Sequence, residues 1–482
     1  MSGIDLLVRG GHVVTPEVEG PLDVGISGGT IAFVAAPGAF DQPARQVIDA
    51  TGKLVLPGGV ETHAHIAEPA HRGWTQGRDV MLQGPGGATR AAAFGGTTTV
   101  ASFAFLGVHA RARDNPLAAI EERIALFTGD AYVDFVFHPG LVGNPSPELL
   151  RRIPEAIEAG SPTFKAFTTC VTSAQRGVKM DDGPLLDLMR VIAEHRGMLW
   201  VHAEADELVT HMEAKLKQEG RDQWFNLHLV HSSTSEELAF HKVCRLAREH
   251  GTAIYFVHVT GAAGTEVIRS ARHAGQPVYG EVLHNYLCFT SEDYKTPDGG
   301  KIQTYPALKS AEDREALWSG LLDGTLTTVA TDEYTTDYAV KVGGKTVETA
   351  CGGHAGIETR GIIAFTEGVA KGRMSLRQFV EAFSTKPAKV LGLFPRKGAI
   401  SPGCDADLVL WDPDDRRTIT LDDLHHDGDY SIWEGWPCVG WPTTTIVRGR
   451  VVVADGKLLG SPDHGRWIPR EFAPEVLTRP SV

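Results

Sequence analysis

The chain has 482 residues, of which 42% are hydrophobic and 22% charged, a composition typical of a soluble globular protein with a large core. Its 46 Lys and Arg against 60 Asp and Glu give a net charge of −14, which disfavours nonspecific binding to nucleic acid or to an anionic membrane but allows a local basic patch. The sequence has no apolar run of the roughly 18–20 residues that span a bilayer, no signal-peptide core in its first residues, and no C-x-x-C among six scattered cysteines. We therefore expect a cytoplasmic protein with reduced cysteines.

Both ends of the chain are rich in short predicted strands. The first fifty residues contain DLLVRGGHVV, DVGISGGTIAFVAA and the start of QVIDATGKLVLPGG, punctuated by glycine and proline, and no helical period appears. Similar segments, DADLVLWDP and TTTIVRGRVVVADGK, return near the C-terminus. The two ends therefore predict one small β-sandwich domain made of residues 1–57 and 395–460, followed by a tail at 461–482.

Between residues 58 and 394, short apolar runs alternate with helical patterns. The predicted strands are 54–60, 97–103, 132–138, 162–167, 198–203, 253–259, 277–283 and 327–332. Signals for helix ends lie between them: Asn115-Pro116 and a capping box at Thr234–Glu237 for starts, Gly251 and Gly275 for stops. About eight strand–helix units indicate a (β/α)₈ barrel. An open doubly wound sheet is disfavoured because no G-x-G-x-x-G motif follows the first strand.

Residue types that bind metals stand at the ends of several predicted strands. They are His63 and His65 after the first strand, Lys165 on the fourth, His202 on the fifth, His258 on the sixth and Asp332 on the eighth. Each one alone has an ordinary structural explanation, such as a hydrogen-bonding histidine or a helix-capping aspartate. Because the carboxyl ends of barrel strands meet at one mouth, the coincidence over five strand ends predicts a metal centre there.

The number and charge of these residues favour two divalent ions. Four imidazoles and one carboxylate exceed the usual ligand set of a single tetrahedral zinc. A protonated lysine would be repelled by two cations, whereas Lys165 converted by CO₂ into a carbamate (N6-carboxylysine) would supply an anionic bridging ligand. Such a centre would activate a bridging hydroxide for attack on a carbonyl, with Asp332 as both ligand and proton shuttle. Imidazole and carboxylate ligands suit zinc, manganese or cobalt.

The order of the motifs GGVETHAH, FKAF, VHAEADEL, FVHVTG and VATDE resembles the amidohydrolase superfamily, and within it the dihydropyrimidinase and D-hydantoinase cyclic amidases. The segment STKPAKVLGLFPRKGAISPGCDADLVLWDPD is among the most family-specific. The resemblance implies an α/β barrel with a β-sandwich, a binuclear centre that is usually zinc, and a homotetramer. By position it assigns the more buried ion to His63, His65 and Asp332, the second ion to His202 and His258, and the bridge to Lys165.

The positions that contact substrate in this family depart from its pattern. Hydantoinases usually carry a carbonyl-binding tyrosine five residues after the bridging lysine, where this chain has Cys170, a much poorer donor. Tyr305 stands at the family's serine, Gly352 at its asparagine, and Glu333 at the histidine that commonly follows the catalytic aspartate. These changes predict retained hydrolytic machinery with altered substrate selection.

Other hydroxyl groups are candidates for the missing contact. Thr168, Thr169 and the Tyr305 hydroxyl are alternative donors, although an aromatic side chain packing in a loop explains Tyr305 equally well. Residues 71–74 follow the His63–His65 pair and form either a loop over the site or a solvated loop.

We therefore expect a binuclear-metal hydrolase that opens a cyclic amide such as a hydantoin, dihydropyrimidine, imide or related ring. The same machinery acting on a linear amide, ureide or hydrazide is the enzymatic alternative. A non-catalytic scaffold homologue is a remote alternative, because scaffold relatives lose metal ligands and all six positions are kept here. The expected partner is a small-molecule substrate, not nucleic acid or a membrane.

Overall fold

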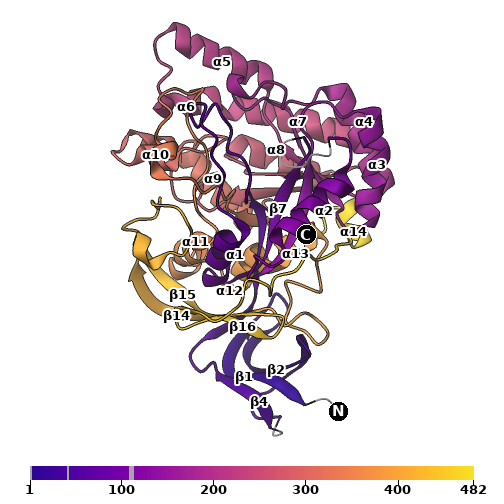
Figure 1. Ribbon diagram of the computed structural model, residues 1–482, viewed down its shortest axis with the longest axis vertical. Helices are drawn as coiled ribbons and strands as arrows, with labels where there is room; N and C mark the ends of the chain where they lie inside the picture. The colour runs from indigo at the N-terminus through magenta and orange to yellow at the C-terminus, as the bar shows by residue number, and fades with distance from the viewer. Residues whose placement is uncertain (1–2, 41–42, 108–112) are drawn as a thin grey trace.

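The computed structural model describes residues 3–40, 43–107 and 113–482, and its larger part is an eight-stranded parallel barrel (Figure 1). Its strands are β6 (Gly59–Ala64), β7 (Thr97–Phe105), β8 (Asp134–Gly140), β9 (Thr163–Phe167), β10 (Met198–His202), β11 (Ala253–Phe256), β12 (Val278–Leu283) and β13 (Thr328–Ala330). They are hydrogen-bonded in chain order. The barrel predicted from the alternation of apolar runs and helical patterns is confirmed.

The barrel closes at the carboxyl ends of its first and last strands. His65 N–H donates to the carbonyl of Glu333 at 2.8 Å, and Glu333 N–H donates to the carbonyl of His63 at 3.2 Å. A parallel bridge between Ala64 and Glu333 joins the same two segments. The chain that follows β13 is therefore fixed directly beside His63 and His65, the predicted metal ligands at the end of β6.

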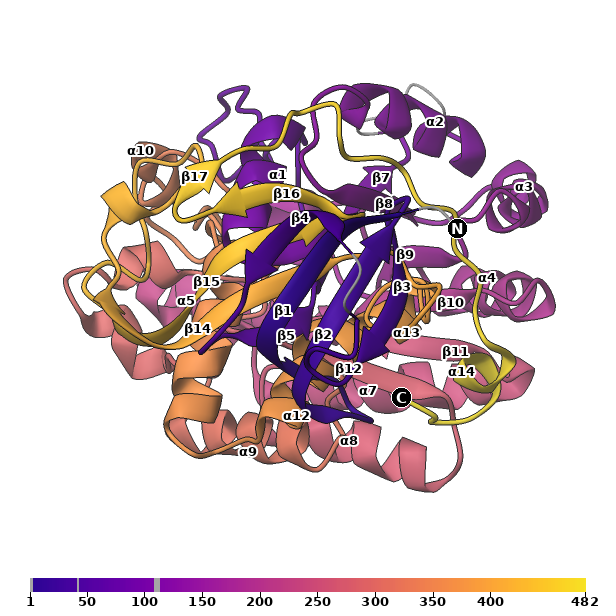
Figure 2. The ribbon, with the colours of Figure 1, turned by 90° about the horizontal axis from the view of Figure 1, so that it is seen from below.

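Helices surround the barrel, and Figure 2 shows α2, α3, α4, α8 and α9 around its periphery. The helices are α1 (Pro85–Phe94), α2 (Pro116–Phe127), α3 (Pro147–Glu158), α4 (Asp182–Glu194), α5 (Asp206–Gln218), α6 (Leu227–Val230), α7 (Ser233–His250), α8 (Ala262–His273), α9 (Ala311–Leu322), α10 (Tyr338–Lys341), α11 (Thr359–Ala364), α12 (Leu376–Val380), α13 (Lys386–Leu391) and α14 (Pro474–Thr478). Two π-helical segments, Phe365–Ala370 and Glu381–Thr385, continue α11 and join α12 to α13. Single 3₁₀ turns lie at Ser173–Gln175, Trp224–Asn226, Ser291–Lys295, Gly299–Ile302 and Leu421–Asp423.

The predicted helix boundaries are confirmed except for one start. Asn115 caps α2 by accepting a hydrogen bond from the backbone N–H of Ala118, and Gly251 ends α7 in the left-handed conformation with φ 68°. The capping box predicted at Thr234 is wrong, because α7 begins earlier. Its cap is Ser232, whose hydroxyl accepts from the backbone N–H of Ser235 and so satisfies one of the free donors of the first turn.

The two ends of the chain form a second, mostly antiparallel sheet, seen in the lower part of Figure 1. Its strands are β1 (Ile4–Val14), β2 (Glu19–Ser27), β3 (Thr30–Ala35), β4 (Ala44–Asp49), β5 (Leu54–Pro57), β14 (Leu408–Thr418), β15 (Pro437–Val447), β16 (Arg450–Ala454) and β17 (Lys457–Leu458). The N-terminal and C-terminal strands of this sheet meet where β14 pairs with β5, with Leu408 opposite Pro57. A small β domain assembled from both ends is therefore confirmed, whereas its exact limits stay predictions.

The predicted first barrel strand, 54–60, is in fact the junction of the two sheets. Residues 54–57 form β5 in the terminal sheet, and the barrel strand β6 begins at Gly59. A Cβ atom on the intervening Gly58 would lie 2.2 Å from the hydroxyl of Thr98, so the crossing requires glycine. The prediction was wrong because a uniformly apolar run carries no signal for a change of sheet.

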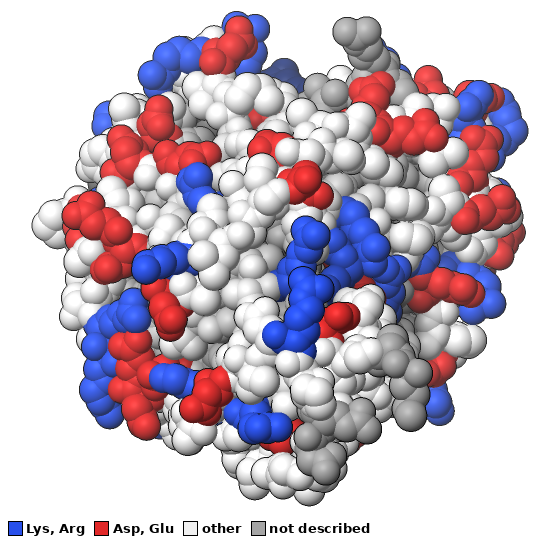
Figure 3. Space-filling model, turned by 60° about the horizontal axis from the view of Figure 1, so that its bottom comes forward, with Lys and Arg blue, Asp and Glu red and all other residues white. Residues whose placement is uncertain are grey.

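One group of Lys and Arg side chains lies near the centre of the face shown in Figure 3, while others are scattered beside acidic side chains at its edges. On the terminal sheet, a groove is lined by Arg45, Arg448 and Arg450. Positive charge is therefore concentrated locally although the chain carries a net charge of −14. Within the described ranges, no helix combines the length and apolar character needed to cross a membrane.

Candidate metal centre and active site

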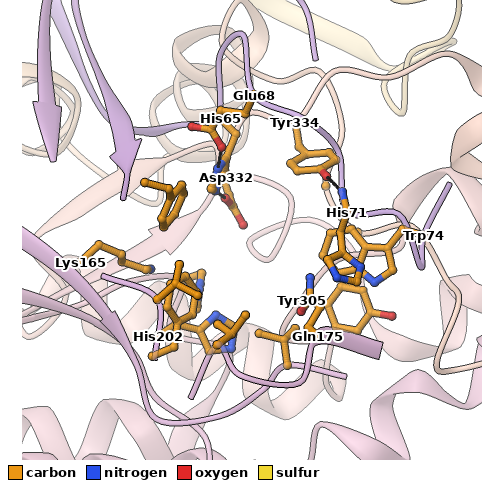
Figure 4. Close-up of a pocket in the computed structure, with 18 of the residues that line it drawn as sticks. His65, Glu68, His71, Trp74, Lys165, Gln175, His202, Tyr305, Asp332 and Tyr334 are labelled. Carbon is orange, nitrogen blue, oxygen red and sulfur yellow. Dashed lines mark hydrogen bonds and ion pairs between the residues drawn. The ribbon is translucent and has the colours of Figure 1, made fainter. Parts of the chain in front are cut away.

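A cavity of about 190 Å³ lies at the carboxyl ends of the barrel strands (Figure 4). All six predicted metal ligands line it: His63, His65, Lys165, His202, His258 and Asp332. They come from β6 and the residue just after it, β9, β10, the segment after β11 and the segment after β13. The structure therefore brings together residues that are up to 269 positions apart in the chain, as the strand-end argument predicts (332 − 63 = 269).

His63, His65 and Asp332 form the tightest group, with potential ligand atoms all within 4.8 Å of one another. One Asp332 oxygen lies 3.0 Å from Nε2 of His63 and 3.2 Å from Nε2 of His65. Burial alone would raise the pKa of Asp332, but the two histidines outweigh burial and hold the pKa well below its usual range. Asp332 also has a positive φ of 51°, a conformation that a non-glycine residue adopts at some cost and that is common at functional sites.

His202, His258 and Lys165 form the other side of the group. The rings of His202 and His258 lie 4.4 Å apart between centroids. Lys165 is 2% exposed, lies over the rings of Phe103 and Phe167, and has no ion-pair partner among the described residues. Burial lowers the pKa of Lys165 to about 7, so much of this amine is neutral near neutral pH. A neutral amine is the form that reacts with CO₂, so the site chemistry fits a carbamate.

In three of the four histidines, one ring nitrogen contacts a buried carboxylate, so only the other ring nitrogen can bind an ion. The pairs are His63 Nδ1 with Glu281, His65 Nδ1 with Glu68 at 2.8 Å, and His202 Nε2 with Glu204 at 2.9 Å. A carboxylate on one ring nitrogen fixes the tautomer and makes the other nitrogen a better metal ligand. This arrangement is typical of metal-binding histidines and is the strongest local indication that these side chains hold cations.

Glu281 connects both halves of the site, and the sequence analysis missed it. One carboxylate oxygen contacts His63 Nδ1 and accepts from the backbone N–H of His258 at 3.1 Å. The other oxygen accepts from the hydroxyl groups of Tyr255 at 2.9 Å and Thr62 at 3.1 Å. A glutamate within the apolar strand PVYGEVL was the available signal, because a fully buried carboxylate needs such partners.

Tyr305 and Gly352 both line the cavity, and their positions are coupled. The Tyr305 ring stacks on Trp74, with 4.9 Å between centroids and 4° between planes. Its hydroxyl lies 3.1 Å from the carbonyl of Val347 and 3.0 Å from that of Ala350, so it is engaged by the surrounding loop. A Cβ atom on Gly352 would lie only 2.4 Å from Cδ2 of Tyr305. The tyrosine ring therefore occupies the space that a side chain at position 352 would need.

The other predicted substrate contacts, Thr168, Thr169 and Cys170, do not belong to the described lining of this cavity. The Thr168 hydroxyl donates to the carbonyl of Glu204 at 2.8 Å. Asp206 accepts from the Thr169 hydroxyl at 3.2 Å and from the Cys170 backbone N–H at 2.8 Å. These contacts tie the loop after β9 to the start of α5, and a role of the three residues in substrate binding stays a prediction.

Glu333 organises the loop next to Asp332. Its buried carboxylate accepts from the backbone N–H of Gly356 at 2.6 Å and of Ile357 at 2.8 Å, and from the Gln83 side chain at 2.8 Å. All of these partners lie in neighbouring loops. Glu333 therefore fixes the loop that carries Asp332 in position relative to the loop that carries Gly352.

Comparisons with known proteins agree with this geometry. The sequence model described as "Amidohydrolase family" matches residues 54–452. A D-hydantoinase from Geobacillus stearothermophilus is 34% identical over 470 residues, covering 96% of this chain and 96% of the relative. The crystal structure of a dihydropyrimidinase from Brevibacillus agri NCHU1002 has a TM-score of 0.89 and 30% identity, covering 97% of this chain and 99% of that one. An L-hydantoinase (dihydropyrimidinase) from Arthrobacter aurescens has a TM-score of 0.87 and 28% identity, covering 97% and 100%.

Proposed function

This chain belongs to the amidohydrolase family, and from that premise we propose that it is a hydrolase of the hydantoinase type that acts on cyclic amides. The proposal is that the protein opens a hydantoin, dihydropyrimidine, imide or related ring at a centre of two divalent cations. The single observation that carries it is the convergence of six ligand-type side chains in one cavity, with carboxylates behind three of the four histidines.

The donor set fits two cations better than one. His63, His65 and Asp332 would hold one ion, and His202 and His258 would hold the other. Lys165, as its carbamate, would add an anionic ligand to this set and offset one positive charge at the site. When bound, the cations supply Lewis acidity that polarises a carbonyl and makes water a nucleophile near neutral pH. Zinc suits this mixture of imidazole and carboxylate ligands, and so do manganese and cobalt.

Asp332 is the group that would move the proton. Its carboxylate is ionised, because His63 and His65 hold its pKa low, and it faces the cavity. Asp332 would take a proton from the attacking water and pass it to the nitrogen that leaves when the ring opens. The backbone hydrogen bonds of Glu333 to His63 and His65 would hold the backbone beside this carboxylate in place during both transfers.

The walls of the cavity support a small ring as substrate. Trp74, Tyr305 and Tyr334 present aromatic surface across from the ligand cluster. Such surfaces bind flat rings by stacking and by exclusion of water. Linear amides, ureides and hydrazides are the alternative substrates of the same machinery. By family resemblance, we further propose a cytoplasmic homotetramer.

The proposal is tested by combined metal analysis and a substrate panel. The protein is produced with zinc or manganese in the medium, and bound metal is measured by mass spectrometry after dialysis. Hydantoin, dihydrouracil and succinimide are compared with a linear ureide, an amide and a hydrazide. We expect about two ions per chain and opening of at least one ring class. Activity confined to open amides would reject the cyclic substrate, and a chain that holds no stoichiometric metal would support the scaffold alternative.

A further inference from the structure

The cavity wall opposite the ligand cluster carries two hydrogen-bond donors that the proposed mechanism does not use. Figure 4 shows His71, Trp74 and Tyr334 across the cavity from Lys165 and His202. Tyr334 spans the space between the two sides, because its ring contacts His65 at 5.7 Å and Trp74 at 5.8 Å between centroids. A ring bound with one carbonyl at the ligand cluster would therefore present its far edge to Tyr334 and His71.

The Tyr334 hydroxyl is fixed in position and its proton is available. Its oxygen accepts from the backbone N–H of His71 at 3.2 Å, drawn as a dashed line in Figure 4. Tyr334 N–H in turn donates to the carbonyl of His354 at 3.1 Å, which holds the backbone of this residue. A phenol has one proton to donate, and the described part of the chain gives that proton no acceptor. A hydroxyl in this state on a residue that lines the cavity is a ready donor to a ligand.

The imidazole of His71 provides a second donor. Its Nδ1 accepts from the backbone N–H of Gly73 at 3.2 Å, so the neutral ring carries its proton on Nε2. Burial lowers the pKa of His71, which keeps the ring neutral and fixes this tautomer near neutral pH. His71 lies beside Trp74, 5.9 Å between ring centroids, and lines the same cavity.

We propose that the Tyr334 hydroxyl and the His71 Nε2–H bind the second carbonyl oxygen of a ring that carries two carbonyls. This inference rests on the proposed function and assigns its preference for rings with two carbonyls to these two side chains: one carbonyl is attacked, and the other is held by the Tyr334 and His71 donors. Lactams with a single carbonyl lack the oxygen that this pair binds.

The test compares glutarimide, with two carbonyls, and 2-piperidone, with one. Dissociation constants for the metal-loaded protein are measured by calorimetry in the cold, where turnover is slow, and kcat and KM are measured separately for any ring that is opened. Tyr334→Phe keeps the aromatic ring and removes the donor. We expect it to weaken glutarimide binding about tenfold, the value of one hydrogen bond, and to leave 2-piperidone binding unchanged.

Two further variants separate binding from folding. His71→Asn keeps an acceptor for the Gly73 N–H and should also weaken only the two-carbonyl ring. Tyr338→Phe makes the same chemical change at an exposed residue of α10 and should alter neither ring. Equal weakening of both rings in Tyr334→Phe and His71→Asn, or no weakening in either, would overturn the inference. If glutarimide binding depends on Tyr334 but no ring is ever opened, the proposed function fails and only the binding role of Tyr334 stands. If Tyr334→Phe binds and opens two-carbonyl rings as well as the unchanged protein does, the binding role fails and the proposed function stands.

Discussion

Replacing Gly352 by alanine tests whether the ring of Tyr305 excludes any side chain at position 352. The backbone of Gly352 is not left-handed, so alanine is conformationally allowed there. Its Cβ would nevertheless lie 2.4 Å from Cδ2 of Tyr305. The tyrosine cannot move away freely, because its ring stacks on Trp74 and its hydroxyl is held by two backbone carbonyls.

The expected magnitude follows from two opposing effects. Forcing an extra methyl group into a packed site costs about 1–3 kcal/mol, and the reduced freedom of the unfolded chain returns about 0.4–1 kcal/mol when glycine becomes alanine. Gly352→Ala should therefore lower the free energy of unfolding by a net of about 1–2 kcal/mol. The substitution should also reduce kcat/KM, because Gly352 lines the cavity.

Denaturant unfolding followed by circular dichroism measures this change in two backgrounds. In the Tyr305→Ser background the clash is absent, so Gly352→Ala should become neutral or stabilising, and the two substitutions should be strongly non-additive. Gly183→Ala in α4 is the matched control: no atom lies within 4 Å of a Cβ there, and alanine should stabilise the helix. A neutral Gly352→Ala in the wild-type chain, or the same effect in both backgrounds, would refute the steric coupling.

Three other predictions concern metal binding and acid stability. Lys165→Ala should lower the metal content and abolish turnover, with partial rescue by short carboxylic acids; full activity would contradict the bridging role. Glu281→Gln should weaken metal affinity about 10–100-fold in a chelator competition, because His63 loses the carboxylate that fixes its tautomer, and an unchanged affinity would count against that role. Burial lowers the pKa of His426 from 6.5 to about 4, so its contribution to stability is present above pH 6.5 and is lost as the pH falls towards 4. His426→Gln should flatten this part of the pH–stability curve, and an identical curve would show that His426 is not responsible.

The barrel was predictable because each strand is a short apolar run bounded by turn residues, and barrel strands are buried on both sides. The same property hid the break at Gly58 within the expected strand 54–60, since β5 and β6 are both completely buried and read as one run. Periodicity reports burial, and it contains no information on which sheet buries a strand. The cap of α7 was misplaced for a local reason, because Ser232 and Thr234 are both acceptable caps and the sequence alone does not rank them.

The cavity-lining ligand-type residues were predictable because histidine, lysine and aspartate at strand ends are chemically conspicuous. Their supporting residues were not, because Glu281 lies within a strand and Glu204 and Glu68 lie in loops where acidic residues are common. Tyr334 was missed for a related reason. A tyrosine two residues after Asp332 has no special pattern, and its role depends on which hydrogen-bond partner the fold leaves for its hydroxyl.

The pairing of β14 with β5 has a consequence for how the protein is made. Leu408 pairs with Pro57, and the distance between them along the chain is 408 − 57 = 351 residues. At about 5–20 residues per second, a ribosome needs roughly 20–70 s to deliver the missing partner. During that interval β5 presents an open, apolar edge, and the strand directly joined to it bears His63. Newly emerging chains should therefore depend on chaperones to shield this edge, and the mouth of the barrel should mature only after translation is nearly complete.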